Sequence, residues 1–525
     1  MVKVLISDKL SEQAVAIFRD RGIDVDFKPG LSADDLLACI GDYDGLAIRS
    51  ATKVTPAVLE KATNLKVVGR AGIGVDNVDC EAATARGVVV MNTPFGNSIT
   101  TAEHALAMMM ALARQIPAAN ESTHAGKWEK SRFMGVELSG KTLGLVGAGN
   151  IGSIVADRAQ GLKMKVVAFD PFLSPERAAE MNVEKKDLDE LLAVADFITV
   201  HTPLTDSTRN LIDAAALAKT KPGIRIVNCA RGGIINEADL LAALESGHVA
   251  GAALDVFTEE PARDNPLFGR PDVVATPHLG AATEEAQENV AVQVAEQMAD
   301  YLLTGAVTNA LNMPSVSAED APKLKPYMVL AEQLGSFAGQ VTETGIKNVT
   351  IEFEGHVAKL NIRPLVQAAL AGMLKPFSDT VNMVNAPVVA RDRGIDVSEV
   401  RHDRTGDYQT LIRLTIETER FTRSVAGTLF GGTKPRIVSI KGIEIEAELT
   451  QNMLYVTNED LPGFIGALGT LFGEKGLNIA TFHLGRASSG GDAIALVQLD
   501  QAVPDDVFAA ICSLKHVKQA KRLRF

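Results

Sequence analysis

Three polar side chains that could act together on a hydroxy acid each follow a short apolar run in the first 280 residues. These side chains are Arg231, Glu260 and His278. An imidazole titrates at about pH 6.5 and can take the proton of a hydroxyl group. A carboxylate beside it stabilises the imidazolium, and a guanidinium can hold a substrate carboxylate in a forked contact. We therefore predict a site where His278 is the base while hydride leaves C2 of a 2-hydroxy acid.

A glycine-rich turn predicts the acceptor of that hydride. Gly147, Gly149 and Gly152 satisfy the pattern G-x-G-x-x-G between a predicted strand and a predicted helix. The first glycine permits a tight turn, the second lets the backbone approach a pyrophosphate, and the third lets helix and strand pack closely. Asp170 follows the next predicted strand, and a carboxylate there accepts hydrogen bonds from ribose hydroxyls and repels a 2′-phosphate. The pattern favours NAD over NADP.

Alternating strand and helix patterns must position these residues. Apolar runs between helical patterns indicate buried parallel strands. We expect such strands at residues 2–6, 46–48, 65–68, 88–91, 142–146, 166–169, 197–200, 225–228, 251–254 and 273–275. This alternation predicts two doubly wound α/β domains that meet near residue 97. Predicted helices at 98–114 and 282–303 join them; Thr283 and Gly305 are suitable caps for the second.

The last 200 residues follow a different pattern. A polar stretch at 315–326 predicts a linker. Apolar and polar residues then alternate at 351–353, 411–415 and 443–449, which indicates an antiparallel sheet with one wet face. Residues 453–525 predict the order β-α-β-β-α-β.

Composition excludes several classes of protein. The 525 residues include 52 Lys+Arg and 65 Asp+Glu, a net charge of −13, which disfavours nucleic-acid binding. The longest wholly apolar run has nine residues, 105–113, whereas a membrane span needs about 20. No signal-peptide pattern opens the chain. Its four scattered cysteines form no C-x-x-C motif, so we expect no disulfide framework, no metal and a reducing cytoplasm.

The motifs at 147–152, 228–233, 255–261 and 277–280 resemble those of the D-isomer-specific 2-hydroxyacid dehydrogenases. The resemblance covers residues 1–312. It implies that Arg231, Glu260 and His278 are catalytic. It also implies a discontinuous substrate-binding domain, 1–97 with 283–312, around an NAD-binding Rossmann domain, 98–282. The residues expected to bind NAD are Ile73, Gly147, Gly149, Asn150, Ile151, Gly152, Asp170, Thr202, Pro203, Cys229, Ala230, Arg231, Asp255, His278, Leu279, Gly280 and Ala281.

Members of this family act on lactate, glycerate, formate or phosphoglycerate. Arg49 and Arg132 could supply the extra cations that a phosphate needs, although the residues alone leave this open. The motifs R-A-G-x-G-V-D-N-V-D at 70–79 and G-K-W at 126–128, and the four-domain layout, resemble the long-form members that oxidise D-3-phosphoglycerate to 3-phosphohydroxypyruvate, the first step of L-serine biosynthesis. The implied substrate residues are Arg49, Ser50, Gly72, Asn97, Arg132, Arg231 and His278.

The remaining residues resemble an α+β intervening domain, 313–450, and a ferredoxin-like ACT regulatory domain, 451–525. ACT domains bind amino acids where two copies pair, which implies a homo-oligomer, dimer or tetramer, and L-serine as effector. Asn458, Asp460 and Asn478 match the ligand positions, but Asn458 departs from the His or Tyr of serine-inhibited relatives.

Two alternatives stay open. One is another D-2-hydroxyacid dehydrogenase, such as a glyoxylate/hydroxypyruvate reductase. The other is an NAD-sensing interaction protein on the same fold, as in some transcriptional corepressors. The ACT-like tail favours metabolic control over the second alternative.

Overall fold

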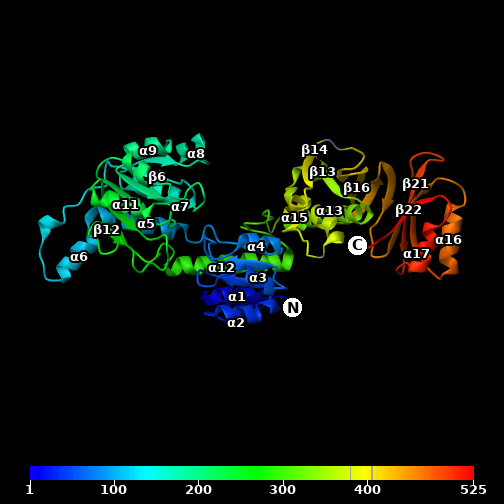
Figure 1. The fold of residues 1–525 in the computed structure, drawn as a ribbon, viewed down its shortest axis with the longest axis horizontal. Coiled ribbons are helices and arrows are strands. Elements are labelled where there is room, and N and C mark those ends of the chain that lie inside the picture. The colour runs from blue at the N-terminus through cyan, green and yellow to red at the C-terminus, as the bar shows by residue number, and fades with distance from the viewer. Residues whose placement is uncertain (318, 379, 404–405) are drawn as a thin grey trace.

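The computed structural model describes residues 1–317, 319–378, 380–403 and 406–525. Figure 1 shows four α/β bodies in a row: a green and cyan one, a blue one, a yellow one and a red one at the C-terminal end. The helix α12 (Glu284–Thr304) runs through the blue body, between α4 (Cys80–Ala85) and α1 (Glu12–Asp20) in this view, although it lies far later in the chain. Among the described residues, no helix is long and apolar enough to cross a membrane.

The first body contains a parallel sheet with the strand order β2-β1-β3-β4-β5. Its strands are β1 (Lys3–Ile6), β2 (Asp24–Phe27), β3 (Gly45–Ile48), β4 (Val67–Arg70) and β5 (Val89–Met91). Its helices are α1 (Glu12–Asp20), α2 (Ala33–Cys39), η1 (Ile40–Asp42), α3 (Pro56–Lys61), α4 (Cys80–Ala85) and the returning α12. In β4, a Cβ on Gly69 would lie 2.2 Å from the Met298 sulfur, so glycine is what lets α12 pack this closely.

The second body contains a seven-stranded parallel sheet with the order β12-β11-β10-β9-β6-β7-β8. Its strands are β6 (Thr142–Val146), β7 (Lys165–Phe169), β8 (Glu184–Lys185), β9 (Phe197–Val200), β10 (Ile224–Asn228), β11 (Val249–Leu254) and β12 (Val273–Ala275). Its helices are α5 (Ser98–Arg114), α6 (Ile116–His124), η2 (Lys130–Arg132), α7 (Asn150–Gly161), α8 (Pro175–Glu180), α9 (Leu188–Val194), α10 (Ala214–Ala218) and α11 (Glu237–Glu245). The order reverses between β9 and β6, which opens a crevice at the carboxyl ends of the strands.

The predicted doubly wound sheets are confirmed, and each predicted strand of the first 280 residues has a counterpart within a few residues. Two strands were not predicted. β2 has the sequence DVDF, and β8 consists of two exposed charged residues, so neither shows an apolar run. The second connecting helix begins after its predicted cap, because the Thr283 side chain accepts a hydrogen bond from the Ala286 N–H at 3.2 Å.

The third body contains a six-stranded sheet with the order β14-β13-β15-β16-β17-β18. Its strands are β13 (Ile346–Gly355), β14 (Asp396–His402), β15 (Thr410–Thr418), β16 (Thr422–Phe430), β17 (Lys434–Ile440) and β18 (Ile443–Ala447). Its helices are α13 (Ala321–Val341), η3 (His356–Lys359), α14 (Arg363–Leu374), η4 (Lys375–Phe377) and α15 (Ala386–Asp392). Helices α13 and α14 pack so closely that a Cβ on Gly335 would lie 2.0 Å from the Ala369 carbonyl oxygen.

Two predictions for this region were inaccurate. The linker predicted at 315–326 ends early, because α13 begins at Ala321; residue 318 lies outside the described part. Leu324 and Tyr327 are buried on α13, so the polar and proline-rich stretch hides the start of an amphipathic helix. The sheet is also not wholly antiparallel, since β14 pairs parallel to β13.

The fourth body has the predicted order β-α-β-β-α-β, with strands paired as β20-β21-β19-β22. Its elements are β19 (Met453–Glu459), α16 (Phe464–Glu474), β20 (Ile479–Arg486), β21 (Asp492–Leu499), α17 (Asp505–Cys512) and β22 (Val517–Leu523). Its sheet shares one hydrophobic core with the third body. At their junction the rings of Phe337 and Tyr455 meet edge to face, with centroids 5.5 Å apart.

Candidate active site

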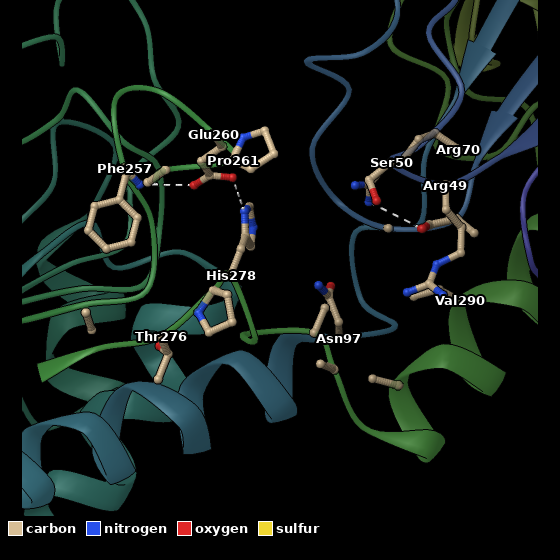
Figure 2. Close-up of a pocket in the computed structure, with 18 of the residues that line it drawn as sticks. Arg49, Ser50, Arg70, Asn97, Phe257, Glu260, Pro261, Thr276, His278 and Val290 are labelled. Atoms are coloured by element: carbon tan, nitrogen blue, oxygen red, sulfur yellow. Dashed lines mark hydrogen bonds and ion pairs between the residues drawn. The ribbon is translucent and has the colours of Figure 1, made fainter. Parts of the chain in front are cut away.

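A cleft of about 800 Å³ lies between the first and second bodies (Figure 2). The loops after β3 and β4 supply one wall, and the loops after β11 and β12 supply the other. Because parallel strands present their carboxyl ends at one edge, both sheets direct the loops that follow their strands into this cleft. Residues predicted from the sequence that line it are Arg49, Ser50, Gly72, Asn97, Glu260, His278 and Ala281.

Glu260 and His278 form a hydrogen-bonded pair on one wall. His278 Nδ1 lies 2.7 Å from Glu260 Oε2, and the Phe257 N–H donates to Glu260 Oε1 at 3.0 Å. Burial raises the pKa of Glu260, but the bonds from His278 and the Phe257 N–H outweigh it, so the pKa lies below its ordinary value. His278 has a left-handed backbone, with φ of 56°, which is unusual for a residue with a side chain. This pair can take up a proton and stabilise the resulting charge.

Two arginines, Arg49 and Arg70, line the cleft, whereas the predicted Arg231 is not among the described residues that line it. Figure 2 shows Arg49 and Arg70 across the cleft from His278. Arg231 follows β10, and its Nε donates to Asp76 Oδ2 at 3.1 Å, which links the loops of the two bodies. Burial, with the charges of Arg231 and Arg49 added, lowers the pKa of Arg70 to about 10, so it remains a cation at neutral pH.

Arg70 is a functional candidate that sequence reasoning missed. It ends β4, and it opens the R-A-G motif that marked the family resemblance. Its position at the carboxyl end of a strand could have identified it as a candidate from the sequence. Its Nε is buried and has no hydrogen-bond partner within the described residues, and its Nη1 donates to the Ala71 carbonyl at 3.3 Å.

Arg132 is not brought to this cleft by the single chain. It lies on η2 in a separate hollow with Arg225, and its Nη1 donates to Glu129 at 3.0 Å. The neighbouring Trp128 and Met134 are 78% and 75% exposed. Figure 1 shows α6 and the chain that follows it standing away from the second body.

The glycine-rich turn has the geometry that a dinucleotide needs. Gly147 adopts φ of 96°, and a Cβ on it would lie 2.6 Å from the His201 carbonyl oxygen. Helix α7 begins after Gly149 with no side-chain cap, so its first N–H groups can receive a pyrophosphate. Asp170 Oδ2 accepts the Ala148 N–H at 2.8 Å, which places this carboxylate beside the turn.

The other predicted cofactor residues surround the same crevice. Asn150, Ile151 and Gly152 form the first turn of α7. Thr202 and Pro203 follow β9, and the Thr202 hydroxyl is buried without a partner among the described residues, so an absent ligand would satisfy it. Ile73 lies in the loop after β4, where its carbonyl accepts the Asn92 amide at 2.7 Å.

The nicotinamide end of the predicted site is formed by the loops after β10, β11 and β12. Cys229 is buried and Ala230 N–H donates to Asn228 Oδ1 at 3.0 Å. Burial raises the pKa of the Cys229 thiol. Asp255 is fully buried and accepts the N–H groups of Leu279 and Gly280 at 2.7 and 2.8 Å. The residues from the glycine-rich turn to the loops after β10, β11 and β12 therefore fit a dinucleotide from its pyrophosphate to its nicotinamide.

The three predicted effector residues do not meet within one chain. Asp460 Oδ2 accepts Arg486 Nη1 at 3.0 Å and the Gly490 N–H at 3.2 Å; these two bonds lower the pKa of Asp460. Asn478 precedes β20, whereas Arg486 ends it, so Asn478 and Asp460 lie at opposite ends of that strand. Asn458 is buried, and its amide donates to the Glu459 carbonyl at 2.8 Å.

Comparisons with known proteins cover the whole chain. The model of the D-isomer specific 2-hydroxyacid dehydrogenase NAD-binding domain matches residues 106–280, and that of the D-3-phosphoglycerate dehydrogenase intervening domain matches residues 323–441. D-3-phosphoglycerate dehydrogenase from Bacillus subtilis is 44% identical over 523 residues, 99% of each protein. The enzyme of that name from Methanocaldococcus jannaschii is 42% identical over 520 residues, again 99% of each. A glyoxylate reductase structure from Paecilomyes thermophila is 28% identical with a TM-score of 0.55, covering 59% of this chain and 98% of its own.

Proposed function

The chain belongs to the D-isomer-specific 2-hydroxyacid dehydrogenase family, in its long D-3-phosphoglycerate dehydrogenase form, and from this premise we propose that it oxidises D-3-phosphoglycerate to 3-phosphohydroxypyruvate with NAD, the first step of L-serine biosynthesis. The cleft supplies the chemistry. When bound, NAD supplies the hydride acceptor. His278 takes the C2 hydroxyl proton as the C2–H bond breaks, and Glu260 stabilises the imidazolium. Arg231 holds the substrate carboxylate and polarises the C2 oxygen.

The observation that carries this assignment is the pair Arg49 and Arg70 on the wall opposite His278. A lactate needs one guanidinium for its carboxylate, and Arg231 can provide it. A phosphorylated substrate brings a second anionic group with about two charges. Two further arginines across the cleft match that group, and Arg70 is half-buried, which lowers the local dielectric of the contact. Ser50, Gly72 and Asn97 complete the substrate wall.

One assay tests the proposal. NADH formation is followed with D-3-phosphoglycerate, D-glycerate and D-lactate in parallel. We expect kcat/KM for D-3-phosphoglycerate to exceed the others by at least about 100-fold, the value of a charge-assisted contact of roughly 3 kcal/mol. Comparable values with D-glycerate would favour a glyoxylate/hydroxypyruvate reductase. No turnover of any of them, with NAD still bound, would favour an NAD-sensing interaction protein.

We assign roles to four parts of the chain. Residues 1–97 with 283–312 bind the substrate, and residues 98–282 bind NAD. Residues 313–450 are the intervening domain, and residues 451–525 are the ACT domain. The chain passes between the first two domains twice, near Thr100 and near Thr283. These two connections lie side by side, and the Thr100 and Thr283 hydroxyls are 3.2 Å apart.

We further propose that the protein is a homo-oligomer with L-serine as an effector of the ACT domain. Strand β20 stands at the edge of its sheet. If two copies pair antiparallel along β20, Asn478 of one copy comes to Asp460 of the other, which one chain alone does not achieve. Asp460 would take the ammonium group, and N–H groups at the start of α16 would take the carboxylate.

Calorimetry with L-serine tests the effector. We expect heat of binding to wild type and none to Asp460→Ala. Asp505→Ala is the control, since Asp505 is an exposed acid of the same domain. Sedimentation tests the oligomer. If millimolar serine gives no heat and leaves activity unchanged, the domain serves assembly only.

All four cysteines are free thiols, which supports a reducing compartment such as the cytoplasm.

A further inference from the structure

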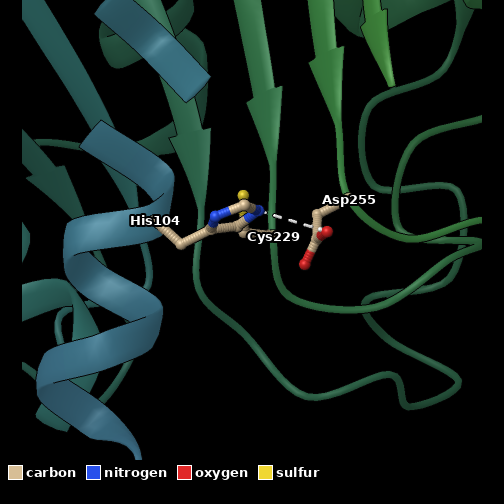
Figure 3. Close-up of side chains that lie close together, drawn as sticks. All are labelled: His104, Cys229 and Asp255. Atoms are coloured by element: carbon tan, nitrogen blue, oxygen red, sulfur yellow. Dashed lines mark ion pairs between the residues drawn. The ribbon is translucent and has the colours of Figure 1, made fainter. Parts of the chain in front are cut away.

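Two side chains of helix α5 hydrogen-bond to the loop that carries His278. Thr101 and His104 lie one turn apart on this helix. The Thr101 hydroxyl donates to the Gly280 carbonyl at 2.8 Å. His104 Nε2 lies 3.2 Å from Asp255 Oδ1 and 3.3 Å from the Thr276 hydroxyl, and Figure 3 shows it directed at Asp255. The side chain of His104 is only 19% exposed.

Asp255 is the centre of this network. Its Oδ1 accepts the Thr276 hydroxyl at 2.6 Å and the Leu279 N–H at 2.7 Å, and its Oδ2 accepts the Gly280 N–H at 2.8 Å. Burial raises the pKa of Asp255, but the bonds from His104, Thr276 and Leu279 outweigh it and lower the pKa. A buried carboxylate that stays charged holds its donors tightly, because losing one leaves an uncompensated charge.

The loop between these donors contains His278 in its left-handed conformation. The His278 N–H donates to the Asp255 carbonyl at 2.9 Å. A non-glycine residue in this region costs about 1–3 kcal/mol, so surrounding contacts must maintain it. The contacts to Asp255 on either side of His278 provide this restraint, and His104 is the side chain that completes them from outside the loop.

We propose that His104 is a positioning residue for hydride transfer: through Asp255 it holds loop 276–280 so that the His278 imidazole meets the C2 hydroxyl. The proposal rests on the function proposed above for His278. His104 is not itself among the described residues that line the substrate cleft, but it contacts Thr276, which is, so it acts on the base through the loop.

A metal site is the competing interpretation of the same cluster. His104, Cys229 and Asp255 offer ligand atoms within 4.8 Å of one another. However, the Asp255 oxygens are engaged by three other donors, and burial disfavours the Cys229 thiolate that a metal would need. The hydrogen-bond network therefore explains this arrangement better.

The experiment compares two substitutions of His104 whose amide side chains differ in length. In His104→Gln the amide can extend to the position of the imidazole Nε2 and donate to Asp255, whereas in His104→Asn it is too short. His104→Ala removes the donor altogether. His248→Ala is the control, since His248 is likewise half-buried and hydrogen-bonded, to Thr220 and the Leu217 carbonyl, but lies in the turn after α11.

For His104→Asn and His104→Ala we expect kcat to fall about 10- to 100-fold, the usual cost of a misplaced catalytic group. The NAD dissociation constant, measured by calorimetry, should rise by much less than kcat falls, because the glycine-rich turn and Asp170 hold the other end of the cofactor. The deuterium isotope effect on kcat with C2-deuterated substrate should rise, because hydride transfer becomes the slow step. His104→Gln and His248→Ala should stay within about threefold of wild-type kcat.

Three results would overturn the proposal. His104→Asn could retain wild-type kcat, His104→Gln could be as slow as His104→Asn, or NAD affinity could fall in proportion to kcat. The last would make the network a cofactor contact instead. If His104→Ala does not fold, the Gln and Asn pair still decides the matter. A wild type that fails to oxidise D-3-phosphoglycerate refutes the proposed function instead.

Discussion

Glu260 Oε2 lies 2.7 Å from His278 Nδ1, and the other oxygen of the same carboxylate accepts the Phe257 N–H at 3.0 Å. The carboxylate is therefore fixed at both oxygens. As an acceptor only, it favours the proton on Nδ1 of His278, which leaves Nε2 as the nitrogen that can receive a proton from substrate.

Replacing His278 by alanine should abolish hydride transfer and spare NAD binding. The base is lost, which costs about 10²–10⁴-fold in kcat. The glycine-rich turn and Asp170 lie elsewhere in the crevice and should still hold the cofactor. Steady-state kinetics and calorimetry with NAD check both parts. A kcat within a few-fold of wild type would remove His278 from the role of base.

The Glu260→Gln variant should lose almost as much activity as His278→Ala. An amide oxygen that accepts the Phe257 N–H turns its NH2 group toward His278 Nδ1, which forces the ring proton to Nε2. We expect kcat to fall by about 10²–10⁴-fold while Glu259→Gln, the exposed neighbour, keeps its activity.

The lowered pKa of Glu260 also predicts a pH response. The wild-type carboxylate stays charged at and below the ordinary range of glutamate, and its contribution is lost only as the pH falls through the lowered pKa. The kcat profile should show no Glu260 titration above about pH 5. A glutamate titration between pH 5 and 7 would contradict the geometry.

Substituting Arg70 should discriminate between phosphorylated and plain substrates. Arg70→Ala should raise KM for D-3-phosphoglycerate about 10- to 100-fold, the cost of one charge-assisted contact. The kcat/KM for D-glycerate, which lacks the phosphate, should change little. Arg86→Ala is the control, because Arg86 is an exposed arginine of the same domain. Equal losses with both substrates would show that Arg70 supports the loop instead of binding phosphate.

Asp170→Ala should narrow the preference for NAD over NADP. The carboxylate would bind the ribose hydroxyls and repel a 2′-phosphate. Asp170→Asn separates charge from hydrogen bonding, because it can still accept the Ala148 N–H. We expect both variants to lower the ratio of kcat/KM for NAD to that for NADP. An unchanged ratio in both would refute the assignment.

Tyr43→Phe should lower the stability of the first domain at neutral pH and make that stability less dependent on pH below about pH 4. The Tyr43 hydroxyl and Lys3 lower the pKa of Asp26 to about 2. A depressed carboxylate stabilises the fold fully above its unfolded pKa of about 4, and that contribution is lost as the pH falls toward the folded value. Without the hydroxyl, we expect about 1 kcal/mol less stability at neutral pH and a shallower loss below pH 4. Denaturant unfolding from pH 2 to 7 measures this, with Tyr408→Phe as control.

The parallel sheets could be predicted because their strands are continuous apolar runs, and the order of the motifs placed Arg231, Glu260 and His278 at three strand ends. Strand β2 escaped detection because DVDF places two acids in four residues. The start of α13 escaped because prolines and lysines surround its buried Leu324. In both segments, packing against the rest of the fold determines the secondary structure, and the local composition does not reveal it.

The candidate site shows the same limit. Arg70 belongs to the R-A-G motif, but its partial burial beside Arg49 arises only when two loops fold together. His104 gave no signal at all, since one histidine on an apolar helix resembles a core residue. Asp460 and Asn478 lie at opposite ends of β20, which a ligand motif along the sequence does not reveal.

The core shared by the third and fourth bodies sets where this chain could be shortened. Tyr455, Met453 and Leu496 pack in the same cluster as Phe337 and Leu330. A stop codon near residue 450 would remove the side chains that cover Phe337 and expose that part of the cluster to water, whereas one near residue 312 would remove almost all of the cluster. The third and fourth bodies should therefore be kept or removed together, because neither keeps its side of the shared core covered without the other.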